Sequence, residues 1–174
     1  MTKQIRYLAT PILLTALIVT LDQITKLLVI RNVPMNTVGV NYLGDFFWIV
    51  HTRNLGIAFS IGNGLPPAAR RILFILIPVL VMVFVSVYYF RAPDLTLGMR
   101  WAMAGILGGG IGNIIDRIVR QDGVVDFLSF KFYGIFGLSR WPAFNIADMS
   151  VVVSGILLVV LFMLQERRIR EQKG

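Results

Sequence analysis

Four aspartates of this chain stand among apolar residues, and two of them could carry out hydrolytic chemistry together. Asp126 lies in the run Gly123-Val-Val-Asp-Phe-Leu, and Asp148 follows Asn145 by three residues, so Asp148 and Asn145 share one face of a helix. Two carboxyl groups that are brought close together cannot both ionise easily, and one of them keeps its proton. The ionised group can take a proton from water while the protonated group hydrogen-bonds the scissile carbonyl. This is the chemistry of aspartic proteases; two unrelated capping or interface aspartates are the alternative.

The other two aspartates, Asp22 and Asp116, each lie four residues before a basic residue. Asp22 precedes Lys26 with the acid first, which is the favourable order for an ion pair on a helix. We expect this pair to orient a site; the alternative is a neutral internal pair that lets the helix end be partly buried. Asp116 is expected to pair with Arg120 and to have a structural role.

Two further polar residues belong to the same predicted helix as Asp116. Asn113 and Arg117 are four residues apart and can face the same interior, while Asp116 lies about 100° away around the helix. We expect Asn113 and Arg117 to support the site. The alternative is a helix end whose charges extend to the lipid headgroups.

The composition limits where this chemistry can take place. Of the 174 residues, 56% are hydrophobic and 15% are charged, and the mean hydropathy is +0.75, which is typical of a polytopic membrane protein. The absence of cysteine excludes disulfides, thiolate catalysis and cysteine-based metal sites. A single histidine, His51, and the lack of a His-Glu-x-x-His motif argue against a zinc protease. We therefore expect no metal and no cofactor.

The apolar segments predict four membrane-spanning helices in one domain, residues 1–174. Each span needs about 20 residues, and suitable stretches occur at residues 7–30, 72–90, 97–118 and 142–164, followed by a charged tail at 166–173. Pro78 is expected to kink the second span. The pairs Gly105/Gly109 and Gly108/Gly112 predict close packing of the third.

The connections complete the predicted fold. Residues 35–66 are expected to form an extracytoplasmic segment with short β-rich pieces at 45–51 and 57–61, and residues 119–141 an extracytoplasmic amphipathic connection. The predicted fold class is an all-α polytopic membrane protein with four transmembrane helices and a small β-rich extracytoplasmic segment.

The predicted spans place every unusual polar residue near one face of the membrane. Successive spans run in opposite directions, so late positions in the first and third spans lie on the same side as early positions in the fourth. The two long connections, which hold Asn54 and Asp126, emerge on that side too. Basic residues are divided almost evenly, eight on the terminal side and seven on the other, but the arginine cluster near the C-terminus favours cytoplasmic termini and an outward-facing site. The net charge of +8 then indicates membrane lipids with anionic headgroups as partners, and the lack of a basic–aromatic module argues against nucleic acid.

Five blocks that occur in order resemble the bacterial lipoprotein (type II) signal peptidase family. They fall within about residues 15–160 and read Asp22-Gln-Ile-Thr-Lys26, Arg53-Asn-Leu-Gly-Ile-Ala-Phe-Ser60, Gly108-Gly-Gly-Ile-Gly-Asn-Ile-Ile-Asp-Arg117, Gly123-Val-Val-Asp-Phe127 and Pro142-Ala-Phe-Asn-Ile-Ala-Asp148. The resemblance implies that Asp126 and Asp148 are the catalytic aspartates. It also implies that a set of seven residues shapes the site and holds substrate: Asp22, Lys26, Asn54, Gly56, Asn113, Arg117 and Asn145.

The resemblance also implies a location, a substrate and an inhibitor. Members of this family act in the bacterial cytoplasmic (inner) membrane and cleave prolipoproteins just before a cysteine that already carries diacylglycerol, and globomycin inhibits them. The chain departs from the family pattern at Gly110, where alanine is common, at Leu55 and Ile57 beside Gly56, and in a longer connection before Trp141. These departures affect neither of the two proposed catalytic aspartates.

Two other functions would use some of the same residues. A small proton-coupled carrier or channel subunit would use membrane carboxylates as relays, although carriers usually place such groups near the midplane and show internal repeats. A serine–lysine signal peptidase would need Ser60 or Ser129 close to Lys26, and no sequence motif supports that pairing. Cleavage of a lipidated prolipoprotein by the purified protein would separate these alternatives.

Overall fold

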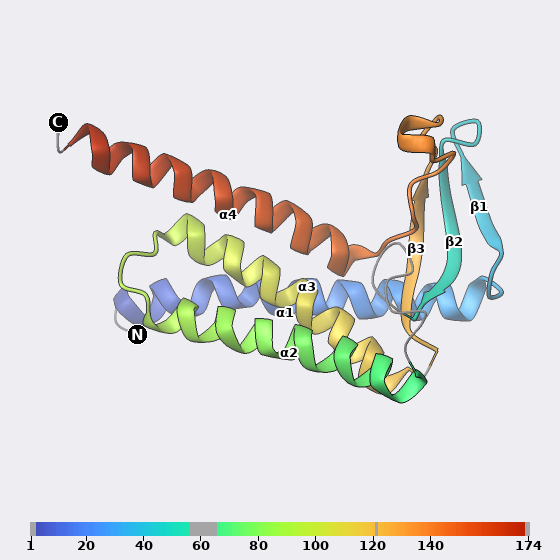
Figure 1. Ribbon diagram of the computed structural model, residues 1–174, viewed down its shortest axis with the longest axis horizontal. Helices are drawn as coiled ribbons and strands as arrows, with labels where there is room; N and C mark the ends of the chain where they lie inside the picture. The colour runs from blue at the N-terminus through green and yellow to red at the C-terminus, as the bar shows by residue number, and fades with distance from the viewer. Residues whose placement is uncertain (1–2, 56–65, 121, 173–174) are drawn as a thin grey trace.

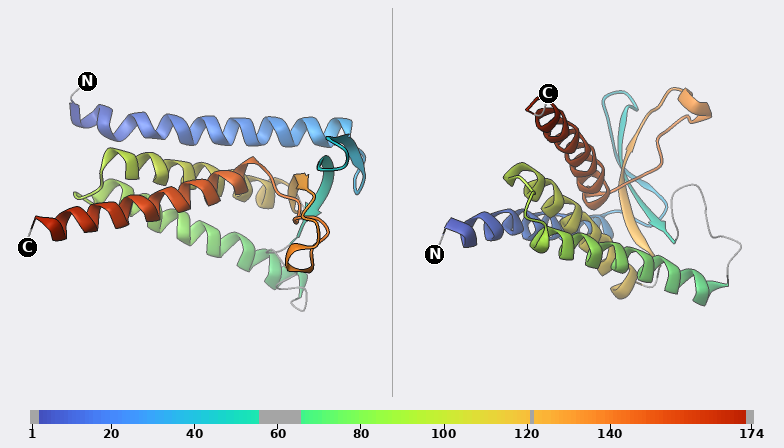
Figure 2. Two further views of the ribbon diagram at one scale, coloured as in Figure 1. Left: turned by 90° about the horizontal axis from the view of Figure 1, so that it is seen from above. Right: turned by 60° about the vertical axis from the view of Figure 1, so that its left-hand side comes forward.

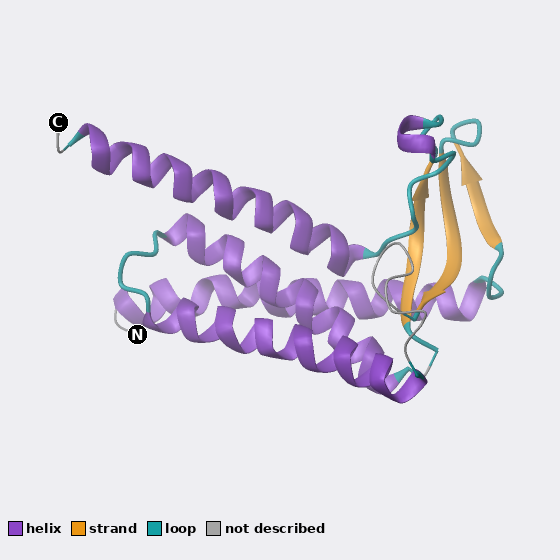
Figure 3. Cartoon of the chain, in the orientation of Figure 1, coloured by secondary structure: helices purple, strands orange, loops and turns teal. Residues whose placement is uncertain are grey.

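The computed structural model describes residues 3–55, 66–120 and 122–172, which form a helical bundle with a small sheet across one end (Figures 1 and 3). The elements in chain order are α1 (Lys3–Asn32), β1 (Val38–Tyr42), β2 (Phe47–Asn54), α2 (Pro67–Arg91), α3 (Leu97–Val119), β3 (Val124–Phe130), the short 3₁₀ helix η2 (Ile135–Gly137) and α4 (Ile146–Glu171). In the described part of the chain, four helices are long and apolar enough to cross a membrane. The predicted four-span fold with a small β-rich segment is therefore confirmed.

The fourth helix begins and ends later than the sequence predicts. It begins at Ile146 instead of Pro142, because the Asn145 side chain accepts a hydrogen bond from the backbone N–H of Asp148 and the Asp148 carboxylate accepts one from the backbone N–H of Asn145. This reciprocal capping box is a strong helix start signal. The residues expected to form a charged tail continue the same helix to Glu171. The second span, α2, is one helix that continues through Pro78.

The glycine-rich helix α3 is the centre of the bundle and packs against all three other spans (Figure 2). Its two glycine pairs face different neighbours. A Cβ at Gly109 would overlap the backbone carbonyl of Ala147 on α4, and a Cβ at Gly112 would lie 2.7 Å from a carboxylate oxygen of Asp22 on α1. The predicted close approach of helix backbones is therefore present at Gly109, while Gly112 leaves room for the Asp22 side chain. The start of α4 and the polar end of α1 thus lie against the same turn of α3.

The three strands form one antiparallel sheet in the order β1-β2-β3, and the sheet stands across the ends of the helices (Figure 1). The strand β3 was not predicted, since we expected residues 119–141 to form only an amphipathic connection. Its apolar residues Val125 and Phe127 are buried against Val29 and Val33 of α1, which holds the strand over the end of the bundle. The β-rich piece expected at 45–51 overlaps β2, and the piece expected at 57–61 lies outside the described residues.

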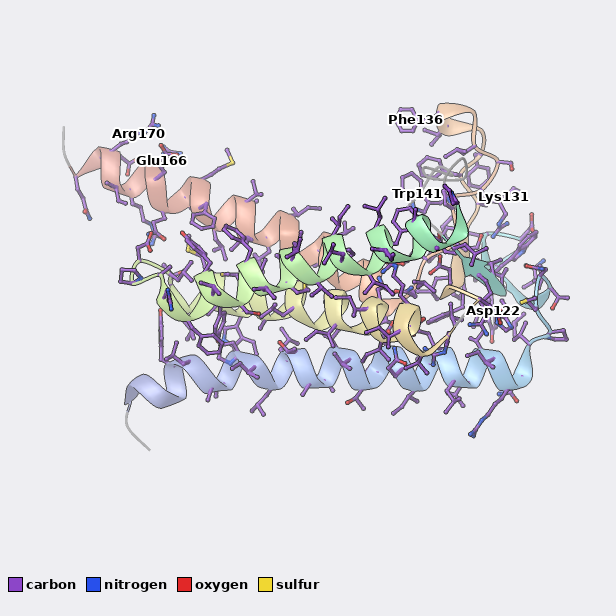
Figure 4. The ribbon with its side chains drawn as sticks, turned by 60° about the horizontal axis from the view of Figure 1, so that its bottom comes forward. Asp122, Lys131, Phe136, Trp141, Glu166 and Arg170 are labelled. Carbon is purple, nitrogen blue, oxygen red and sulfur yellow. The ribbon has the colours of Figure 1, made fainter. Side chains whose placement is uncertain are left out.

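The ends of the molecule differ in character. The first turn of α1 and the last turns of α4 lie at the end opposite the sheet (Figure 1). Charged residues mark both ends: Glu166 and Arg170 pair near the end of α4, and Lys131 lies at the sheet end (Figure 4). This arrangement agrees with a bundle whose apolar middle section spans a bilayer.

Candidate active site

Asp126 lies on β3 and is almost fully buried, with 3% of its surface exposed. Its Oδ1 accepts a hydrogen bond of 2.8 Å from Asn145 Nδ2, and its Oδ2 accepts one of 3.2 Å from Asn54 Nδ2. Burial, and to a lesser extent the charge of Asp148, raise the pKa of the Asp126 carboxyl from 3.8 to about 7, although the hydrogen bonds from Asn54 and Asn145 act in the opposite direction. Asp126 is therefore able to hold a proton near neutral pH.

Asp148 lies in the first turn of α4 and is only half-buried. Its Oδ1 accepts a hydrogen bond of 2.7 Å from Asn113 Nδ2, and its Oδ2 accepts one of 3.1 Å from the backbone N–H of Asn145. Both aspartates accept two N–H hydrogen bonds, but Asp148 is more exposed and lies at a helix N-terminus, a position that favours a negative charge. Its environment thus differs from that of Asp126.

Asn145 joins the two carboxyl groups. Its side-chain amide donates to Asp126 Oδ1, its backbone N–H donates to Asp148 Oδ2, and its Oδ1 accepts from the Asp148 backbone N–H at 2.9 Å. One residue therefore contacts both aspartates, which come from elements 22 positions apart in the sequence. The charge of Asp148 is also close enough to raise the pKa of Asp126, so the structure brings the sequence-predicted pair together.

The predicted ion pair between Asp22 and Lys26 is present and fully buried, with Lys26 Nζ 2.7 Å from Asp22 Oδ2. The same ammonium group lies 3.1 Å from Asp116 Oδ2 and donates to Asn113 Oδ1 at 3.1 Å. Asp116 also pairs with Arg120, as the spacing predicts. The cluster therefore contains two acids and two bases, and its charges balance.

Sequence reasoning missed Gln23, which lies between the two buried acids. Its Nε2 donates to Asp22 Oδ2 at 3.1 Å and to Asp116 Oδ1 at 3.0 Å, and its Oε1 accepts from Arg120 at 3.0 Å. The only sequence signal for this role is the position of Gln23 inside the Asp22–Lys26 block. An uncharged residue at that position does not by itself indicate a contact with Asp116. An amide is well suited to this position because it can donate and accept at once.

The remaining predicted site residues have different outcomes. Asn54 ends β2 and reaches Asp126, and Arg117 is half-buried, with a guanidinium that donates to the Asn113 carbonyl at 3.4 Å. Asp126, Asp148 and Asp116 all lie close enough to Arg117 for their charges to interact with it. Gly56 lies outside the described residues.

The serine–lysine alternative gains no geometric support from the residues described. Ser60 lies outside them, and the Ser129 hydroxyl accepts from Arg140 Nε at 3.1 Å. The three Lys26 contacts given above are to Asp22, Asp116 and Asn113 instead. Among the residues that the structure describes, no group of three or more His, Cys, Asp or Glu side chains could hold a metal ion.

Comparisons with known proteins agree on one family. Residues 14–164 match the family model described as signal peptidase (SPase) II. The chain is 49% identical over 162 residues to the lipoprotein signal peptidase of Treponema pallidum, covering 93% of this chain and 87% of that protein. It is 44% identical to the lipoprotein signal peptidase of Treponema denticola, with 89% of each chain covered. A solved structure described as a bacterial membrane enzyme, determined by the in meso method, superposes with a TM-score of 0.76 at 27% identity, covering 90% of this chain and 89% of that one.

Proposed function

We propose that this chain, which belongs to the signal peptidase II family, uses Asp126 and Asp148 to remove signal peptides from prolipoproteins. The observation that carries the assignment is the shared contact through Asn145, which hydrogen-bonds both carboxyl groups. Family membership makes the chain an aspartic protease, and it gives no support to the carrier or channel alternative. The buried cluster of Asp22, Lys26 and Asp116 then supports the site instead of relaying protons across the membrane.

The two environments suggest a division of labour between the aspartates. Asp126 is almost fully buried, and its raised pKa of about 7 lets it keep a proton. Asp148 is more open and lies in the first turn of α4, where the helix N-terminus favours a negative charge. Asp148 takes a proton from the attacking water as the water oxygen bonds to the scissile carbonyl carbon, while Asp126 donates its proton to the carbonyl oxygen. When the tetrahedral intermediate collapses, the proton now on Asp148 passes to the leaving amine, and Asp126 recovers its own from the hydroxyl group.

The proposed substrate is a prolipoprotein that is cleaved just before a cysteine carrying diacylglycerol. The buried polar residues around Asp126, among them Asp22, Lys26 and Asp116, lie at one end of four apolar helices. A lipid chain can therefore stay in the bilayer beside the helices while the peptide bond reaches the two aspartates. The lipid is already in hydrocarbon before binding, and most of its burial free energy therefore cannot drive recognition. Its role is to hold the cysteine at a fixed depth and to raise its local concentration. Globomycin-type inhibitors are expected to compete for this same site.

The proposed location is the bacterial cytoplasmic (inner) membrane, with the single domain crossing it four times. Both ends of the described chain lie opposite the sheet, so cytoplasmic termini would place residues 35–66, residues 119–141 and the active site at the outer face. A reporter fused after Lys173 should then be cytoplasmic, and one inserted at Asn63 should be external. The opposite result would invert this orientation without moving the site relative to the helices.

The decisive experiment compares three aspartate-to-asparagine variants of the purified protein on a lipidated prolipoprotein. Asp126→Asn and Asp148→Asn should each abolish cleavage while the protein stays folded, because the change is nearly isosteric. The losses should not add in the double variant, since the two groups act as a unit. Asp122→Asn is the matched control, because Asp122 is exposed on the same connection as Asp126 and should leave activity unchanged. Full activity in Asp126→Asn or in Asp148→Asn would refute the assignment.

A further inference from the structure

Lys26 contacts three acceptors in the polar core beside Asp126 and Asp148, the proposed catalytic dyad. Each acceptor is hydrogen-bonded either to Asp148 or to the residue that precedes Asp126 or Asp148. A lysine ammonium group has three N–H donors and no acceptor. Its three partners are Asp22 Oδ2 at 2.7 Å, Asp116 Oδ2 at 3.1 Å and Asn113 Oδ1 at 3.1 Å. All three donors of this fully buried group can therefore be satisfied at once.

Two of the routes run through backbone N–H groups. Asp22 Oδ1 accepts a hydrogen bond of 3.0 Å from the backbone N–H of Ala147, and Asp116 Oδ2 accepts one of 3.0 Å from the backbone N–H of Val125. Ala147 immediately precedes Asp148, and Val125 immediately precedes Asp126. Each buried acid thus holds the segment that carries one member of the dyad, and Lys26 holds the two acids together.

The third route runs through a side-chain amide. Because Lys26 can only donate, the Asn113 oxygen must face it, and the Asn113 nitrogen is then directed at Asp148 Oδ1, 2.7 Å away. The same Asn113 oxygen also accepts from Asn145 Nδ2 at 3.1 Å. The lysine therefore determines which end of the Asn113 amide meets the dyad.

We propose that Lys26 is a positioning residue that sets the relative placement of Asp126 and Asp148 by holding Asp22, Asp116 and Asn113 at one point. The proposal rests on the assignment of these two aspartates as the catalytic dyad. It gives Asp116 a second role beyond its pairing with Arg120, since its other oxygen fixes the start of β3. The three partners come from α1 and α3, and the two segments that they hold belong to β3 and α4, so one ammonium group connects four elements.

Two substitutions separate positioning from charge balance. Lys26→Arg keeps the positive charge between the buried acids, but a planar guanidinium cannot direct its donors at three oxygens around one point. Lys26→Met removes the charge and all three donors, and leaves two buried carboxylates without their shared partner. Arg100→Met is the matched control, because Arg100 is a buried cation at the opposite end of α3 that donates to the backbone carbonyls of Tyr89 and Ala92.

The measurements are kcat, KM, the pH dependence of kcat/KM and thermal unfolding, all on purified protein with a lipidated prolipoprotein. Lys26→Arg should lower kcat on the order of a hundredfold, with little change in KM, because small displacements of reacting groups are this costly. The acidic and alkaline limbs of its kcat/KM–pH profile should also move, since the spacing of the two carboxyl groups sets their mutual repulsion. Arg100→Met should lower the unfolding temperature but leave kcat and the pH limbs of the folded enzyme unchanged.

The outcomes distinguish this proposal from the assignment on which it rests. If Lys26→Arg has wild-type kcat and wild-type pH limbs while Asp126→Asn and Asp148→Asn are inactive, Lys26 does not position the dyad and the proposed function stands. If the two asparagine variants are active, the proposed function itself fails. Should Lys26→Met not fold, Lys26→Arg alone decides the question, because it keeps the charge that the fold requires.

Discussion

Replacing Asp126 by asparagine should abolish cleavage and yet stabilise the folded protein at alkaline pH. Burial and the charge of Asp148 raise the pKa of this carboxyl from 3.8 to about 7, so the folded protein binds the proton more tightly than the unfolded chain does. The stability that comes from the protonated carboxyl is present below about pH 4 and is lost as the pH rises through 7. Between pH 5 and pH 8 the wild-type protein should lose about 2–3 kcal/mol of unfolding free energy from this group alone. Asparagine does not titrate, so the variant should not show this loss.

The assay is unfolding of wild type and Asp126→Asn in the same micelles at pH 5 and pH 8. Asparagine places an N–H₂ group opposite the donors of Asn54 or Asn145 and so loses about one hydrogen bond, worth about 1 kcal/mol, at both pH values. The quantity to compare is therefore the difference in unfolding free energy between the variant and the wild type, and how much this difference changes from pH 5 to pH 8. Asp122→Asn, at an exposed position, should show no such change. An equal difference at pH 5 and pH 8 would refute the idea that Asp126 carries a proton that burial imposes.

Three further predictions concern the hydrogen bonds, the packing and the substrate. Asn54→Leu removes a donor that favours the ionised form of Asp126, so the alkaline limb of kcat/KM should move up by about one pH unit; a shift of the acidic limb instead would mean that Asp126 is the base. Gly109→Ala should destabilise the protein by about 1–3 kcal/mol and lower kcat, because the new methyl group on α3 displaces the Ala147 carbonyl at the start of α4; Gly155→Ala, at an open position on α4 itself, should do neither. A membrane-inserted precursor without the diacylglyceryl group should be cleaved poorly in a direct comparison with the lipidated form, and equal rates would contradict the positioning role of the lipid.

The sequence predicts the membrane fold well, because the signals for a span are local. Hydropathy over about 20 residues identifies each helix, and the alternation of spans then places Asp22, Asn113 and Asp148 in one layer without any knowledge of contacts. Glycine pairs similarly predict close packing, since a missing side chain is visible in the sequence. The predicted start of α4 at Pro142 is wrong because the Asn145 capping box, which is equally visible in the sequence, determines where the helix begins.

The strand that carries Asp126 shows where local signals are insufficient. The run Val124–Phe130 is rich in strand-forming residues, but a single strand has little stability without partners. Its partner β2 precedes it by a whole pair of membrane helices, and its buried face packs on the end of α1. Both neighbours are distant in the sequence, so the pattern alone could not separate a strand from an amphipathic connection.

Partners that are distant in the sequence also explain why helical spacing alone predicts only a structural role for Asp116. On its own helix Asp116 points away from Asn113 and pairs with Arg120, and helical spacing supports nothing more. Its second oxygen meets Lys26 of α1 and the Val125 N–H of β3, contacts that exist only after three elements have packed together. A carboxylate has two oxygens with several acceptor positions, and the pairing of Asp116 Oδ1 with Arg120 leaves Oδ2 available for other donors. An acid that is satisfied within its helix should therefore still be examined for a second, long-range partner whenever it lies in an apolar layer beside a candidate site.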